Sequence, residues 1–219
     1  MRMKRLLFAA YSLDLGGIET ALVTLLNYLK KEGHEITLVL EKKEGIFLDE
    51  LDKEITVIEY RPSEHKNILK RKQKNLEKRL NFAKEYKNKF DFAASFATYS
   101  LVSSFVARTA SQNCALWCHA DYLTLFNGDI PSMKRFFDDL NYKEFKHIIF
   151  VSEEGKQSFL KVFPKMKDIV ISCNNLIDYQ KIIQKSKEKI ELEKTKEITF
   201  LNLGRHDEKQ KRLSRLIEA

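Results

Sequence analysis

The chain has 219 residues, of which 43% are hydrophobic and 32% charged, and this composition is typical of a globular rather than a disordered protein. No apolar run approaches the roughly 18 to 20 residues that a transmembrane helix needs, so such a helix is excluded. The net charge of +8 comes from residues 61–90, where eleven Lys or Arg stand against three Glu, so the rest of the chain is nearly neutral.

The first residues, MRMKRLLFAAYSLDLGG, have the basic front and the short apolar run of a signal peptide, but Asp14 stands where a small-residue cleavage site would lie. We therefore interpret this stretch as a first strand. The three cysteines are an odd number, and without an export signal they favour reduced thiols. We expect a cytoplasmic protein.

Apolar runs of strand length alternate with helical patterns along the chain. The expected strands cover 5–11, 35–40, 55–60, 90–96, 115–119, 147–152, 168–173 and 197–203. The first expected helix begins at Ile18, and Gly33 stands where its C-terminal stop belongs. Further helices are expected over 67–88, 100–110, 132–145, 153–162 and 178–188. This alternation predicts an α/β fold, a Rossmann-like doubly wound parallel sheet whose ligands bind beyond the carboxyl ends of the strands.

A charged segment, QKSKEKIELEKTK at 184–196, is the best candidate for a linker between domains. We expect one domain over 1–183 and the start of a second over 197–219. One strand and one helix cannot bury their own apolar faces, so this second part needs further partners.

The loop after the first strand is SLDLGGIET. Gly16 and Gly17 permit a tight turn and a close approach of the backbone to a ligand, and the helix that follows would aim its free N–H groups at an anion. The alternative interpretation is that the two glycines only allow the turn between strand and helix and bind no ligand. Neither the GxGxxG fingerprint nor the Walker pattern is present, which removes support for nicotinamide and ordinary ATP sites.

The segment CALWCHADY places a histidine near the carboxyl end of a strand. Strand alternation puts Cys114, Leu116 and Cys118 on one face and sends His119 to the other, where it could contact a ligand or serve as a satisfied structural histidine. A zinc site made of Cys114, Cys118 and His119 is the more specific alternative. Its spacing is not that of a zinc ribbon, so we predict no metal.

A basic loop, GRHDEKQKR, follows the last expected strand. Arg205, Lys209, Lys211 and Arg212 form a candidate cradle for a diphosphate, although a loop of this kind is usually only solvated.

A basic helix is expected over 67–88. The residues expected to face the core are Leu69, Leu76, Leu80, Ala83, Tyr86 and Phe90, which leaves KRKQKNLEKR largely on the other face. Such a charge run is most often a solvated surface, and residues 61–90 are also compatible with resting on anionic lipid. Nucleic acid ranks third, and we predict no such partner, because no exposed aromatics or binding motif accompany the charge.

The order of five segments along the chain carries more information than any one of them. They are LDLGGIETALVTLLNYL, LWCHAD, IIFVSEEGKQSF, VISCNNLID and FLNLGRHDEKQKRLSRLIEA. Together the chain resembles the retaining glycosyltransferases of family 4, the glycosyl transferase group 1 type with the GT-B fold. The resemblance implies sugar transfer from a nucleotide diphosphate donor, UDP- or GDP-linked, to the hydroxyl of a glycan or a lipid-linked acceptor, with retained anomeric configuration. It implies a role in bacterial surface polysaccharide or glycolipid synthesis, no cofactor and no strict need for a metal.

The resemblance also assigns residues. Arg205 and Lys211 match the diphosphate-binding Arg and Lys of the family, with Lys209 as the reserve choice, and fixed positive charge there would stabilise the departing diphosphate. Gly16 and Gly17 match the loop that closes over the donor phosphates. His119 matches the active-site histidine near the transferred sugar.

In this family FLNLGR is the first strand of a C-terminal Rossmann-like domain that supplies most of the donor pocket. The resemblance therefore implies an acceptor-side domain followed by the first βα unit of the donor domain. The Glu-x7-Glu pair that contacts the donor would lie beyond position 219, so we expect little or no activity from this polypeptide by itself. We also expect peripheral contact with the inner face of the membrane. The alternative hypothesis is a non-catalytic split or degenerate domain that binds an acceptor or a partner chain.

Overall fold

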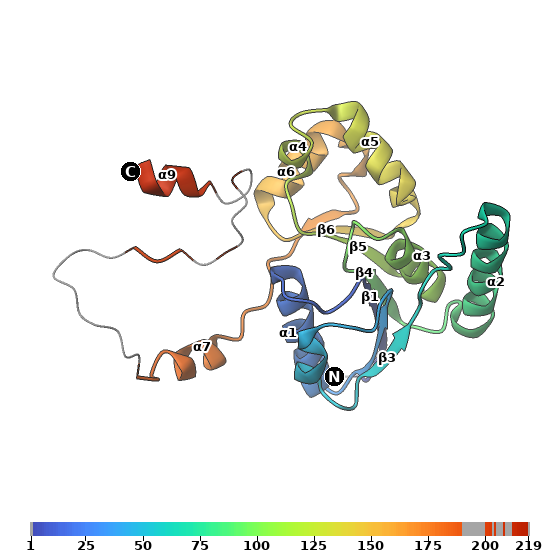
Figure 1. The fold of residues 1–219 in the computed structure, drawn as a ribbon, viewed down its shortest axis with the longest axis horizontal. Coiled ribbons are helices and arrows are strands. Elements are labelled where there is room, and N and C mark those ends of the chain that lie inside the picture. Colours follow the sequence, from blue (N-terminus) through green and yellow to red (C-terminus); the bar gives the residue numbers. More distant parts are fainter. Residues whose placement is uncertain (1, 190–199, 203, 205–207, 209–211, 219) are drawn as a thin grey trace. The chain divides into compact units, whose positions relative to one another are not determined.

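A seven-stranded parallel sheet organises the first part of the chain in a computed structural model that describes residues 2–189, 200–202, 204, 208 and 212–218 (Figure 1). The strands are β1 (Arg5–Ala10), β2 (Glu35–Leu40), β3 (Thr56–Glu59), β4 (Phe92–Ser95), β5 (Cys114–Cys118), β6 (His147–Phe150) and β7 (Val170–Ser172). They lie in the order β3-β2-β1-β4-β5-β6-β7, and every neighbouring pair is parallel. The predicted doubly wound α/β sheet is confirmed.

Helices connect the strands, as parallel pairing requires. They are α1 (Gly17–Lys31), α2 (Ile68–Tyr86), α3 (Leu101–Ala110), α4 (Tyr122–Leu125), α5 (Ile130–Asp139) and α6 (Glu153–Val162), with the short 3-10 turns η1 (Ile46–Glu50), η2 (Tyr142–Glu144) and η3 (Pro164–Met166). Because the strand order reverses between β1 and β4, right-handed crossovers place α1 on one face and the later helices on the other.

Two hydrophobic cores follow from the alternation of side chains along each strand. In β1, Leu7 and Ala9 belong to the core beneath α2 to α6, whereas Leu6 and Phe8 belong to the core beneath α1. The core beneath α2 to α6 is rich in aromatic rings, among them Phe137 and Phe159, whose centroids lie 4.9 Å apart. The strands β1, β2, β4, β5 and β6 are therefore buried on both sides, which explains their nearly continuous apolar sequences.

The structure departs from the predicted helices at two places. The helix expected over 132–145 ends at Asp139, because Asn141 adopts a left-handed conformation with φ of 52° and a 3-10 turn follows. In α2, Leu69, Leu76 and Leu80 do not face the core as predicted, and their side chains are exposed. Phe82 is the residue of α2 that is buried, and it packs on the rings of Tyr60 and Phe105.

The contacts divide the chain into two units, Met1–Asp178 and Tyr179–Ala219. In the second unit the described elements are the helices α7 (Tyr179–Lys185) and α9 (Leu213–Glu218). Of the strand predicted over 197–203, residues 200–202 are described, and they form no regular structure. A lone strand would leave its backbone groups without partners. The predicted linker at 184–196 lies largely outside the described residues, so that boundary stays a prediction.

Within the part of the chain that the structure describes, no helix combines the length and the apolarity that crossing a bilayer requires.

Candidate active site at the carboxyl edge of the sheet

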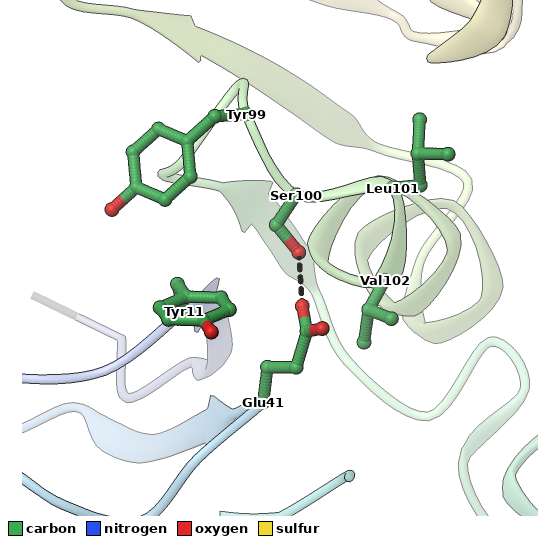
Figure 2. A pocket seen from close by; sticks show the side chains of 6 residues that line it. All are labelled: Tyr11, Glu41, Tyr99, Ser100, Leu101 and Val102. Atoms are coloured by element: carbon green, nitrogen blue, oxygen red, sulfur yellow. Dashed lines mark hydrogen bonds between the residues drawn. The ribbon is translucent and has the colours of Figure 1, made fainter. Parts of the chain in front are cut away.

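The direction of the strand order changes between β1 and β4, and this is where open α/β sheets bind their ligands. A surface pocket of about 300 Å³ lies at the carboxyl ends of β1, β2 and β4. Figure 2 shows its lining, which consists of Tyr11, Glu41, Tyr99, Ser100, Leu101 and Val102. The topology thus brings residues from distant parts of the sequence to one place.

Polar and aromatic groups share this pocket. The Ser100 hydroxyl donates a hydrogen bond of 2.8 Å to the Glu41 carboxylate (Figure 2). The rings of Tyr11 and Tyr99 lie with centroids 6.2 Å apart, and the Lys42 ammonium lies 5.2 Å from the centroid of the Tyr11 ring. A carboxylate, a hydroxyl and aromatic faces can together hold a small polyhydroxylated molecule by hydrogen bonding and stacking.

The glycine loop runs from the end of β1 to α1. Gly16 has extended backbone, with φ of −171°, and Gly17 is the first residue of α1, so the tight turn expected of these glycines is not what the backbone requires. Gly17 instead provides space, because a Cβ added there would meet no atom within 4 Å. The N-terminus of α1 is therefore open to approach along its backbone.

A glycine outside this loop, Gly45, holds the loop in place. Gly45 has φ of +124°, and a Cβ on it would lie 2.0 Å from the carbonyl carbon of Leu13. Backbone hydrogen bonds from Leu13 to Glu44 and from Phe47 to Leu13, of 2.9 and 3.1 Å, join the two segments. The chain between β2 and η1 is thus a support for the loop before α1.

The N-terminus of α1 lacks a side-chain cap. The helices α2 to α6 begin with Asn67, Ser100, Asp121, Asp129 and Ser152, each of which accepts a hydrogen bond from a backbone N–H of its helix. Gly16 offers no such group to α1. No N-cap side chain therefore occupies the first N–H groups of α1, where the helix dipole favours an anion.

Glu19 lies beside this end of the helix. The Glu19 Oε2 atom lies 2.1 Å from where a Gly16 Cβ would be, and the Oε1 atom accepts a hydrogen bond of 3.2 Å from the Tyr99 hydroxyl. Burial, together with the nearby Glu19 carboxylate, raises the pKa of Tyr99, so the phenol stays protonated and donates. Glu19 thereby connects the α1 terminus to the pocket.

His119 follows β5 and is half-buried at the same edge of the sheet. Its ring packs on Phe96 with centroids 4.6 Å apart, and its Nε2 atom is buried without a hydrogen-bond partner among the described residues. Burial lowers the pKa of His119 to about 4, although a hydrogen bond with the Phe96 backbone acts in the opposite direction. The imidazole is therefore neutral at pH 7.

The predicted alternation along β5 is confirmed. Cys114, Leu116 and Cys118 belong to the core beneath α2 to α6, whereas His119 packs on Phe96 in the core beneath α1. The three zinc ligands considered from the sequence therefore do not converge. Among the described residues, no group of three or more His, Cys, Asp or Glu side chains is arranged to hold a metal ion.

The structure brings two of the predicted site segments to one edge, Gly16 with Gly17 and His119. Glu19 contacts Tyr99 and His119 contacts Phe96, and both partners lie just after β4. Arg205, Lys211 and the reserve choice Lys209 lie outside the described residues, so their assignment stays a prediction.

Sequence reasoning missed the residues that line the pocket. Tyr11, Glu41 and Tyr99 stand within four residues of the ends of β1, β2 and β4, and a search of every position after a strand would have found them. Gly45 carries no such signal, because its conformation is visible only in three dimensions.

A family model described as Glycosyltransferase Family 4 matches residues 15–174. The Anabaena protein Alr3699/HepE, solved in complex with UDP-glucose, is 15% identical with a TM-score of 0.57, over 81% of this chain and 45% of that one. An alpha-glucosyltransferase in complex with UDP-glucose and DNA containing an abasic site is 16% identical with a TM-score of 0.50, over 83% of this chain and 45% of that one. No curated protein sequence matches the chain.

Both similarities to solved structures concern the fold, and the chain spans about 45% of the length of these proteins. The family model covers well over half of the sequence and includes Gly16, Gly17, His119 and the residues that line the pocket other than Tyr11. The chain belongs to glycosyltransferase family 4.

Proposed function

We propose that this chain is the acceptor-side half of a retaining glycosyltransferase that uses a UDP- or GDP-linked sugar. The product would be a glycan or glycolipid of a bacterial surface. The resemblance noted in the sequence and the family membership support this proposal, and so does the binding of UDP-glucose by Alr3699/HepE.

One observation carries the proposal, namely the uncapped N-terminus of α1 beside the pocket at the switch point. Gly17 leaves open space there, and no side chain caps the helix, so the backbone can approach the phosphates of a donor. Binding of a diphosphate requires the Glu19 carboxylate to move, because two anions at one helix end repel each other.

His119 has a defined part in this proposal. A neutral imidazole with a pKa of about 4 is a weak base at pH 7, so we assign it the role of hydrogen-bonding a sugar hydroxyl. The Nε2 atom is buried and has no partner in the part of the chain that the structure describes, so this bond requires the site to open enough to expose it. Such a bond would fix the sugar relative to the pocket lined by Tyr11, Glu41 and Tyr99, to which we assign the acceptor.

The second lobe would supply the charge that stabilises the leaving diphosphate. We assign Arg205 and Lys211 to this role on the family resemblance, and the remaining contacts to residues outside this chain. The polypeptide by itself is accordingly expected to show little turnover. The runner-up function, a non-catalytic domain that binds an acceptor or a partner chain, shares this expectation.

A complementation assay separates the two functions. The purified chain is incubated with UDP- and GDP-sugars and with lipid-linked and glycan acceptors, alone and with a separately expressed donor domain. The proposal expects product only from the complemented pair, with retained configuration by NMR, and a large loss for Arg205→Ala. A folded pair that binds acceptor without transfer would favour the non-catalytic function. Robust turnover by the chain alone would contradict the need for a second lobe.

Donor binding by the complemented pair supplies an independent check. Gly17→Ala should weaken UDP binding in calorimetry about tenfold or more, because the added Cβ would occupy the open space and keep a phosphate from a charge-assisted hydrogen bond with the backbone. Thr24→Ala, farther along α1, is the matched control and should bind as the wild type does.

A further inference from the structure

Helix α2 carries an apolar stripe that does not pack on the protein. Leu69, Leu76 and Leu80 are 77%, 59% and 62% exposed. Their spacing of seven and four residues places them on one face of the helix. Three large apolar side chains aligned on one exposed helix face mark an interaction surface.

The opposite side of α2 is the one that holds the helix in place. Phe82 is 5% exposed and packs on the rings of Tyr60 and Phe105, with centroids 5.3 and 6.0 Å away. The Asn75 side chain accepts a hydrogen bond of 2.6 Å from the Ser63 backbone. Leu76 stands about 120° around the helix from Phe82. The helix is thus anchored with its leucines turned outward, and Figure 1 shows it at the periphery of the first unit.

Basic side chains accompany the stripe. Helix α2 contains seven Lys or Arg and two Glu. Lys70, Lys72, Lys74 and Lys84 are exposed, and none of them forms an ion pair with a residue that the structure describes. Lys72 and Lys84 lie about 60° on either side of the leucine stripe. Their stems can lie along an apolar surface while the ammonium groups reach its anionic border.

A partner that binds the leucine face of α2 must offer both an apolar region and negative charge. A nucleic acid would satisfy the lysines and leave the leucines in water, and a second copy of α2 would oppose one positive face to another. An anionic lipid surface meets both demands, because acyl chains receive the leucines and headgroups neutralise the lysines. We infer that α2 docks flat on an anionic bilayer, with Leu69, Leu76 and Leu80 inserted at the boundary between headgroups and acyl chains.

Vesicle binding tests the inference without any dependence on sugar transfer. The full chain is sedimented with vesicles of phosphatidylcholine and with vesicles of equal parts phosphatidylglycerol and phosphatidylcholine. We expect binding to the anionic vesicles, weakened by added salt, and little binding to the neutral ones. The leucine variant replaces Leu69, Leu76 and Leu80 by Gln, and the charge variant replaces Lys70, Lys72, Lys74 and Lys84 by Gln.

Replacement of Lys72 and Lys84, which flank the stripe, should lower the partition coefficient about fivefold each, as expected for about 1 kcal/mol per basic residue near an anionic surface. Lys74 lies about 140° around the helix from Leu69, so its replacement should have a smaller effect. The leucine variant should lower it at least about tenfold in total, since inserted leucines lose their apolar burial. All replaced residues are exposed, so circular dichroism should show unchanged folding.

Matched controls use residues elsewhere on the first unit. The charge control replaces the exposed Lys134, Lys146, Lys165 and Lys167 by Gln, and the apolar control replaces Leu125, Ile130 and Ile171 by Gln. Both controls should bind nearly as the wild type does, because their positions lie outside α2.

Fluorescence reports insertion directly. The chain has a single tryptophan, Trp117, which is buried in β5. After Leu76→Trp, lipids brominated in the acyl chain should quench the introduced indole, while Trp117 emission in the wild type stays unquenched.

Three results would overturn the inference. They are failure of the wild type to bind anionic vesicles at low salt, unchanged binding by the leucine variant, and light scattering that shows a dimer broken by the leucine substitutions. The last result would assign the stripe to contact between copies. Failure of sugar transfer in the complementation assay would leave vesicle binding unaffected.

Discussion

The low pKa of His119 makes this residue a measurable source of acid sensitivity. We consider the substitution His119→Gln, which keeps a polar side chain of similar size and removes the titrating group. Burial lowers the pKa of His119 to about 4 in the folded protein, against an ordinary value of 6.5. The unfolded chain thus takes up the proton at a higher pH than the folded chain does.

The sign and the size of the effect follow from this difference. The contribution of His119 to stability is present above pH 6.5 and is lost as the pH falls toward 4. Between pH 7 and about pH 4.5, the wild type should lose about 2.5 kcal/mol of unfolding free energy through this residue. His119→Gln should lack this loss. Its unfolding free energy relative to that of the wild type should therefore rise by the same amount as the pH falls from 7 to about 4.5.

Urea unfolding monitored by circular dichroism at both pH values measures the double difference, in which the titration of all other groups cancels. NMR of the imidazole protons in the folded protein gives the pKa directly. An imidazole that titrates near 6.5, or an equal pH dependence in the wild type and the variant, would refute the buried, neutral histidine on which its proposed role depends.

Three further substitutions test the surroundings of the site by urea unfolding. Gly17→Ala should stabilise the chain by about 0.4 to 1 kcal/mol while it weakens UDP binding, because the helix gains and the space for phosphate is reduced; a loss of stability would contradict the open site. Gly45→Ala should destabilise by about 3 kcal/mol, since the residue has φ of +124° and presses on Leu13; wild-type stability would show that the loop is not held there. Asp121→Ala should cost about 1 to 2 kcal/mol through the lost cap of α4, and Asp121→Asn should recover most of it; equal effects would argue against capping.

The sheet could be predicted because its strands are short apolar runs separated by helical patterns. The run CALWC was enough to place Cys118 and His119 on opposite faces, since alternation along a strand is a local property. The same reasoning failed in α2, where leucine spacing indicated a buried face. The helix buries Phe82 there, because the rings of Tyr60, just after β3, and of Phe105 in α3 offer it partners that no local pattern reveals.

The candidate site was predictable in part. Gly17 and His119 follow strands and could be found by inspecting the loops after them. The pocket depends on the adjacency of β1 and β4, whose residues are more than eighty positions apart, so Tyr11 and Tyr99 could not be paired from the sequence. The break at Asn141 was missed because a left-handed residue is not marked by composition.

The position of β1 in the sheet has a consequence for synthesis of the protein. This strand precedes the other strands of the sheet in the sequence, yet it lies between β2 and β4, and Leu6 is in register with Phe92. A chain emerging from the ribosome can pair β1 with β2 early, but it must keep the other side of β1 available until Phe92–Ser95 has been translated. Removing Arg5–Ala10 would therefore separate β2 and β3 from the other four strands, so the loss of β1 is far more damaging than its place in the sequence suggests.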